Sequence, residues 1–217
     1  MDEKLKLEPE KQEKVDKFRI LNRYAQKGAT LFVGSSLMEG FPINEFLMDY
    51  GMPQVIYNRG IGGFTIPELY SVREVCIFDL SPSRIFINIG TNDIASQGYT
   101  LEKLLENYRT LLLQMKERLP EAEVYMMAYY PVNETEHFDV EIEWQKHVFE
   151  GTRTNKNIEV ANEAVEKLAE ELGYHFINVN KGLFDEKGQL KREYTIEGLH
   201  MYANGYYAVF EELKQYL

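Results

Sequence analysis

A regular alternation of short apolar runs and longer helical patterns restricts the folds open to this chain. Runs rich in Val, Ile, Phe or Tyr and bounded by turn residues predict five strands, at residues 30–33, 54–58, 84–89, 123–129 and 175–179. Helical periodicity predicts helices at residues 101–119, 157–172 and 203–217. This alternation predicts an α/β fold, a three-layer α/β/α sandwich whose parallel strands carry helices on both faces.

The length of 217 residues fits one such domain. We expect it to occupy residues 29–217, after an N-terminal helical extension over residues 1–28 whose charged helix, at residues 8–26, packs on the outside. The first fourteen residues lack the apolar stretch of a secretory signal. Because no run approaches the ~20 apolar residues of a membrane span, we expect no stable membrane insertion and a cytoplasmic location.

Charge narrows the choice of partner. The chain has 24 Lys and Arg against 35 Asp and Glu, a formal net charge of -11. Nucleic-acid binding needs a basic face, so we expect no nucleic-acid partner. The single cysteine, Cys76, excludes an intrachain disulfide and a cysteine-rich metal site, and its apolar neighbours predict a buried helix position. The 15 Tyr and 12 Phe residues could fill the core or form a homodimer interface.

Ligands of open parallel sheets bind beyond the carboxyl ends of the strands, so these segments are the candidates for chemistry. The first strand leads into Gly34-Ser35-Ser36 at the start of a helix. A serine hydroxyl there lies among backbone N–H groups that can stabilise an oxyanion. The alternative is that Ser35 or Ser36 only caps the helix.

The next two strands end in segments rich in glycine and asparagine. Gly60, Gly62 and Gly63 follow the second strand and would let the backbone approach a ligand closely. A phosphate-binding loop is disfavoured, because the chain has neither a G-x-G-x-x-G pattern after the first strand nor a P-loop lysine. Asn92 follows the third strand and offers an amide donor, or it belongs to a turn and helix cap.

Near the C-terminus, Glu197 precedes His200 by three residues in a loop that opens the last helix. A carboxylate there can hold Nδ1–H of the imidazole and leave Nε2 free as a base. We interpret the other histidines, His137, His147 and His175, as ordinary surface or core residues.

These segments, in this order, resemble the SGNH hydrolase superfamily, the GDSL-like lipases and acylhydrolases, from about residue 30 to the C-terminus. The pattern is most similar to the lysophospholipase-like and platelet-activating-factor acetylhydrolase-like branch. The resemblance implies a flavodoxin-like five-stranded parallel sheet and no metal or organic cofactor. It also implies three catalytic residues, namely Ser36 as nucleophile, His200 as base and Glu197 as its orienting carboxylate.

The implied oxyanion hole consists of the backbone N–H groups of Ser36 and Gly63 and the side chain of Asn92. Three positions depart from the family pattern. Ser35 and Phe64 each replace an Asp, and Phe64 would make the floor of the pocket more apolar. Glu197 also replaces the usual Asp, and its longer side chain needs a slightly displaced backbone.

The resemblance implies a serine esterase that cleaves a small-molecule carboxylic ester, such as an O-acetyl group, through an acyl-serine intermediate. Alternatives are a lysophospholipase or thioesterase acting on longer chains, and an SGNH-fold binding protein impaired by Glu197. A flavodoxin-like nucleotide or flavin binder is a further alternative, motivated by the glycines at 60–63. The long polar segment 130–156, with Phe138, Trp144 and Phe149, is either a lid or a surface excursion.

Overall fold

The computed structural model describes residues 5–139 and 152–217. Five parallel strands form one sheet in the order β2-β1-β3-β4-β5. They are β1 (Thr30–Gly34), β2 (Ile56–Gly60), β3 (Arg84–Asn88), β4 (Glu123–Met127) and β5 (His175–Ile177). The five predicted strands are confirmed, and the order is the flavodoxin-like one implied by the family resemblance.

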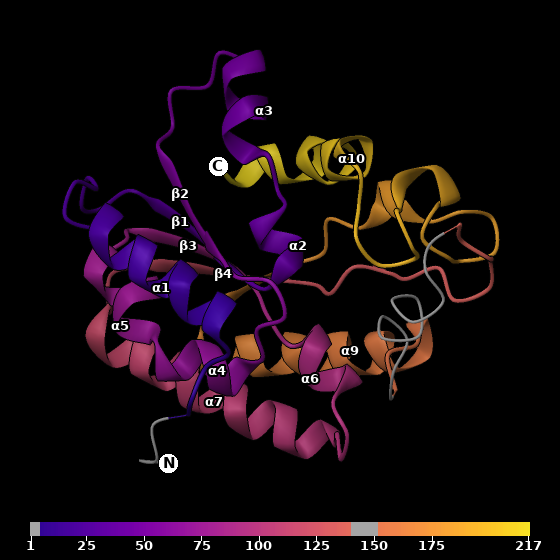
Figure 1. The fold of residues 1–217 in the computed structure, drawn as a ribbon, viewed down its shortest axis with the longest axis horizontal. Coiled ribbons are helices and arrows are strands. Elements are labelled where there is room, and N and C mark those ends of the chain that lie inside the picture. Colours follow the sequence, from indigo (N-terminus) through magenta and orange to yellow (C-terminus); the bar gives the residue numbers. More distant parts are fainter. Residues whose placement is uncertain (1–4, 140–151) are drawn as a thin grey trace.

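Helices cover both faces of the sheet (Figure 1). On one face lie α3 (Ile43–Asp49) and α10 (Ala203–Leu213). On the other lie α1 (Pro9–Leu21), α4 (Ile66–Ser71), α5 (Arg73–Cys76), α7 (Leu101–Arg118) and α9 (Asn155–Leu172). The predicted α/β/α sandwich is therefore confirmed. None of the helices in the described ranges is long and apolar enough to cross a membrane.

Shorter helices connect these elements. The helices α2 (Ser36–Glu39) and α6 (Thr91–Ala95) begin directly beyond the carboxyl ends of β1 and β3. Single 3₁₀ turns lie at Phe78–Leu80, Lys181–Leu183, Arg192–Tyr194 and Lys214–Tyr216. The helix predicted for residues 203–217 is therefore shorter than expected. Helix α10 stops at Leu213, and the 3₁₀ turn Lys214–Tyr216 follows it.

The core forms because strands and helices bury their apolar side chains against one another. Ile85, Phe86 and Ile87 are consecutive in β3 and all fully buried, as expected for a parallel strand covered on both faces. The long helices turn one apolar stripe to the sheet; in α7 it consists of Leu104, Tyr108, Leu111, Leu112 and Met115. Cys76 lies buried in α5, as predicted.

Helix α1 is attached to this core at its C-terminal end. Its only fully buried apolar residue is Val15. Beyond the helix, the Asn22 side chain donates to the carbonyl of Val75 at 2.7 Å and accepts two bonds, at 2.9 and 3.1 Å, from the guanidinium of Arg59 in β2. Burial lowers the pKa of Arg59, which also lies over the Phe18 ring of the same helix. Buried polar contacts therefore fix α1 against the sheet.

Candidate active site

The first strand delivers Ser36 to the carboxyl edge of the sheet. A Cβ atom on Gly34 would lie 2.0 Å from the carbonyl oxygen of Asn88, so only glycine fits where β1 turns into α2. Ser35 occupies the N-cap position of α2 without a side-chain capping bond, and Ser36 is its first helical residue. The Ser36 hydroxyl instead faces His200, with 2.9 Å between Oγ and Nε2. The capping alternative is therefore not observed.

The histidine is held by the loop that precedes α10. Thr195 and Met201 pair across the base of this loop, and the Thr195 hydroxyl donates to the His200 carbonyl at 2.8 Å. Gly198 has a φ of 105° and turns the backbone where other residues would be strained. The loop thus presents the imidazole of His200 from a closed, hydrogen-bonded frame.

Glu197 lies inside the same loop and is fully buried. One of its carboxylate oxygens, Oε1, contacts Nδ1 of His200 and also accepts the backbone N–H of His200 at 3.0 Å. A carboxylate at Nδ1 holds the imidazole tautomer that leaves Nε2 able to accept a proton from Ser36. The loop therefore accommodates the longer side chain of glutamate and brings Ser36, His200 and Glu197 into one hydrogen-bonded row.

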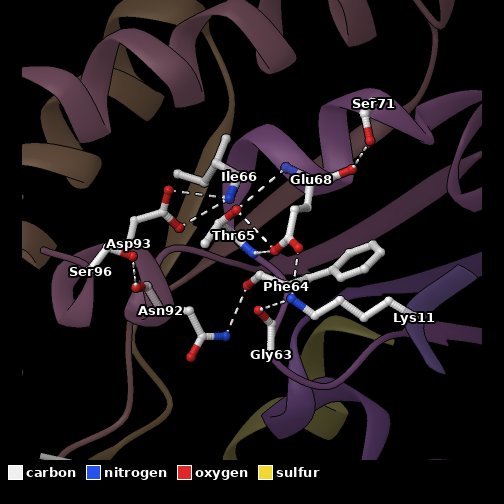
Figure 2. Close-up of polar contacts among 10 residues, drawn as sticks. All are labelled: Lys11, Gly63, Phe64, Thr65, Ile66, Glu68, Ser71, Asn92, Asp93 and Ser96. Atoms are coloured by element: carbon white, nitrogen blue, oxygen red, sulfur yellow. Dashed lines mark hydrogen bonds and ion pairs between the residues drawn. The ribbon is translucent and has the colours of Figure 1, made fainter. Parts of the chain in front are cut away.

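The three expected oxyanion donors lie at the same edge. The backbone N–H groups of Ser36 and Gly63 have no acceptor within the described part of the chain. Gly63 has a φ of 72°, a conformation that favours glycine. Asn92 donates one amide hydrogen to the carbonyl of Phe64 at 2.9 Å (Figure 2). Its second amide hydrogen has no acceptor among the described residues.

A cleft of about 940 Å³ connects these groups. Ser36, Gly63, Asn92 and His200 all line it, whereas Glu197 lies behind the imidazole. The remaining walls come from the N-terminal segment and α1, the loop after β2, α6 with the turn that follows, and the start of α7. The arrangement matches that of a serine hydrolase, which needs a nucleophile, its base and oxyanion donors around one opening.

Comparison with known proteins identifies the family. The profile of the GDSL-like lipase/acylhydrolase family matches residues 32–208. The chain belongs to this family. The resemblance to SGNH hydrolases is thereby confirmed, and membership supports an esterase or acylhydrolase activity.

Similar proteins agree with this membership. A Streptococcus pneumoniae structure whose description names platelet activating factor has a TM-score of 0.83 and 31% identity, covering 95% of this chain and 92% of that one. A GDSL esterase/lipase of Arabidopsis thaliana is 27% identical, over 72% of this chain and 69% of the relative. The isoamyl acetate-hydrolyzing esterase of Saccharomyces cerevisiae is 26% identical, over 76% of this chain and 69% of that relative.

This GDSL-like hydrolase also has site residues that its sequence did not indicate. Arg153 is buried, and it donates to the carbonyl of Thr91 at 3.1 Å and to Oδ1 of Asn92 at 2.8 Å. Burial lowers the pKa of Arg153 to about 10, while the charge of Glu197 acts in the opposite direction. A guanidinium only donates hydrogen bonds, so it holds Oδ1 toward itself and turns the Asn92 amide nitrogen toward Phe64.

Asp93 links the same turn to α4. Its two carboxylate oxygens accept the backbone N–H of Ile66 at 3.0 and 3.3 Å (Figure 2). Burial raises the pKa of Asp93 to about 7, although the bond from Ile66 opposes the shift. The segments after β2 and β3 are thus tied together at two successive residues, Asn92 and Asp93.

Other residues singled out in the sequence lie elsewhere. His175 in β5 stacks on Tyr125, and His137 is exposed, so neither belongs to the Ser36 row. The Phe64 side chain is fully buried in the core and does not line the cleft. Phe64 therefore does not form the apolar pocket floor that we expected from the sequence.

Within segment 130–156, Phe138 is buried, while Trp144, His147 and Phe149 lie outside the described residues. In the ranges 5–139 and 152–217, no group of three or more His, Cys, Asp or Glu side chains is placed to hold a metal ion.

Proposed function

We propose that this chain is a serine esterase that hydrolyses carboxylic esters through an acyl-serine intermediate. The observation that supports the proposal most directly is the 2.9 Å contact between Ser36 Oγ and His200 Nε2, with the buried Glu197 carboxylate at the opposite ring nitrogen. In this proposal Ser36 attacks the ester carbonyl, His200 takes the hydroxyl proton, and Glu197 stabilises the imidazolium that forms.

The attack creates a tetrahedral oxyanion. The N–H groups of Ser36 and Gly63 and the second amide hydrogen of Asn92 are its proposed donors, because they line the cleft and have no acceptor among described residues. One such donor contributes on the order of 3 kcal/mol to transition-state stabilisation. The imidazolium then gives its proton to the leaving alcohol as the carbon–oxygen ester bond breaks.

Water completes the cycle. His200 takes a proton from a water molecule as its oxygen attacks the acyl-serine carbonyl, and returns that proton to Ser36 Oγ as the acid leaves. Besides the ester and water, these steps need only the side chains and backbone amides already described. His200 acts as base in each attack and as acid when each leaving group departs. The alternative of a purely binding protein leaves the Ser36–His200–Glu197 row without a role.

For the substrate we propose a short-acyl ester, such as an O-acetyl group. The yeast relative is named for hydrolysing isoamyl acetate, and many of the residues lining the cleft are polar or charged. The cleft volume of about 940 Å³ also favours a second candidate, a lysophospholipid or thioester with a longer acyl chain.

Hydrolysis of p-nitrophenyl acetate, butyrate and octanoate by wild type and Ser36→Ala tests the proposal. We expect turnover of the short esters and its loss in the variant, together with labelling of wild type alone by a fluorophosphonate. A preference for octanoate would select the longer-chain candidate. Wild-type turnover by Ser36→Ala would refute the nucleophile, and a wild type that neither turns over nor labels would favour the binding protein.

A further inference from the structure

Helix α1 contacts the glycine turn from the side of the cleft. The ammonium group of Lys11 donates to the carbonyl of Gly63 at 3.0 Å and pairs with the Glu68 carboxylate at 2.7 Å (Figure 2). Both side chains of this pair are largely buried, at 17% and 14% exposure. The aliphatic stem of Lys11 passes close to Gly63, since a Cβ atom there would lie 3.2 Å from Lys11 Cε. Lys11 therefore holds one carbonyl of the turn.

A second lysine of α1 acts on the neighbouring residue through a carboxylate. Lys14 pairs with Oε1 of Glu39 at 2.6 Å, and Oε2 of Glu39 accepts the backbone N–H of Gly62 at 2.7 Å. A Cβ atom on Gly62 would lie 3.9 Å from Cβ of Ser36. The contacts from Lys14 through Glu39 to Gly62 therefore lie next to Ser36, the proposed nucleophile.

The Gly63 N–H belongs to the peptide group between Gly62 and Gly63. The contacts of Glu39 and Lys11 hold the peptide group before it and the one after it. The N–H of Gly62 belongs to the preceding peptide, and the carbonyl of Gly63 belongs to the following one. That following peptide is held once more, because the N–H of Phe64 bonds to the carbonyl of Ile61 at 3.2 Å. Glycine rotates freely about its backbone bonds unless held, so restraint on both sides sets the direction of the central N–H.

We propose that Lys11 and Lys14 are positioning residues, which hold the Gly62–Gly63 turn so that the Gly63 N–H stays directed at the oxyanion. The inference rests on the proposed esterase function. The lysines come from a helix that is itself anchored, because Arg59 and Asn22 fix its C-terminal end in the core. A partly exposed ion pair such as Lys14–Glu39 adds little to stability, so we expect its effect to appear in the rate.

Steady-state kinetics on p-nitrophenyl acetate separates positioning from stability. Lys11→Met and Lys14→Met should lower kcat by about tenfold or more, as small misplacements of reacting groups do, with little change in KM. Lys14→Arg keeps the charge and should restore most of kcat. The matched control is Lys17→Met, which breaks a 2.7 Å ion pair with Glu13 on the exposed side of α1 and should leave kcat unchanged.

Amide exchange provides a readout that does not require turnover. In ¹⁵N-glycine-labelled protein, the Gly62 N–H should exchange faster in Lys14→Met than in wild type, and no faster in Lys17→Met. Wild-type kcat and wild-type Gly62 exchange in Lys14→Met would overturn the inference. A wild type inactive on every ester would instead refute the proposed function, and the exchange rates would still decide whether α1 holds the turn.

Discussion

Replacing Glu197 by Asp should impair the enzyme, although Asp is the residue that the family usually carries. The Glu197 carboxylate is fully buried and serves two groups of His200, the ring Nδ1 and the backbone N–H. Aspartate is shorter by one carbon–carbon bond, about 1.5 Å. The contact with the backbone N–H, now 3.0 Å, would lengthen toward ~4 Å and no longer be a hydrogen bond.

The size of the effect follows from what the carboxylate does in the proposed mechanism. Disabling the orienting carboxylate of a serine hydrolase by an Asp→Asn change lowers kcat by about 10⁴. Glu197→Gln, which keeps the length and removes the charge, should approach that value, or about 5 kcal/mol at 1.36 kcal/mol per decade. Glu197→Asp keeps the charge nearby, so we expect a loss of about 10², or ~2.7 kcal/mol.

The assay is kcat and KM for p-nitrophenyl acetate, with thermal unfolding as a check that each variant is folded. Glu193→Asp is the matched control, since it makes the same chemical change at an exposed position in the 3₁₀ turn just before this loop. The control should retain the wild-type rate. Full activity of Glu197→Asp would refute the reasoning, because it would mean that the loop readjusts and that side-chain length does not set the position of His200.

Three further outcomes follow from the contacts around the site. Arg153→Lys replaces the planar guanidinium, which bonds both the Thr91 carbonyl and Asn92 Oδ1, by an ammonium that lacks this fork geometry. Asn92 should then lose its fixed orientation and kcat should fall by about tenfold, and an unchanged kcat would contradict this. Burial raises the pKa of Asp93 to about 7, so the folded state binds the proton more tightly and stability should fall as the pH rises from about 4 to 7. In urea unfolding, Asp93→Asn should lose less stability than wild type between about pH 4 and 7, with a difference of at most about 4 kcal/mol. An equal loss in variant and wild type would refute the raised pKa of Asp93. Gly90→Ala should destabilise the fold by about 3 kcal/mol in urea unfolding, because the new Cβ would lie 2.2 Å from the Tyr129 hydroxyl at a φ of 133°, and wild-type stability would contradict the clash.

The strands were predictable because their signal is local. Each consists of a short apolar run between turn residues, and the limits of all five lie within two residues of those expected from the sequence. The grouping of Ser36, His200 and Glu197 was expected from the resemblance to SGNH hydrolases, and the placement of Ser36 also from the rule that ligands bind beyond the carboxyl ends of parallel strands. What the sequence could not specify was how the Glu197 loop would fit the longer side chain, which depends on the Thr195–Met201 pairing.

Contacts between distant segments escaped prediction. Lys11 and Gly63 are 52 residues apart, and Arg153 and Asn92 are 61 apart. Helix α1 buries only Val15 completely, so its pattern of residues does not show which surface it covers. Arg153 belongs to the long segment 130–156, for which we predicted neither a helix nor a strand, and nothing in the sequence marks it as a buried arginine.

The row formed by Ser36 and His200 spans almost the whole chain, since 164 residues separate its two members. The serine is presented by β1 and α2, whereas its base belongs to the loop before α10. The serine can therefore become reactive only once that loop has docked. The rate at which a fluorophosphonate labels refolding protein would therefore report when the last helix docks. A spectroscopic signal that depends on the sheet alone would not report this step.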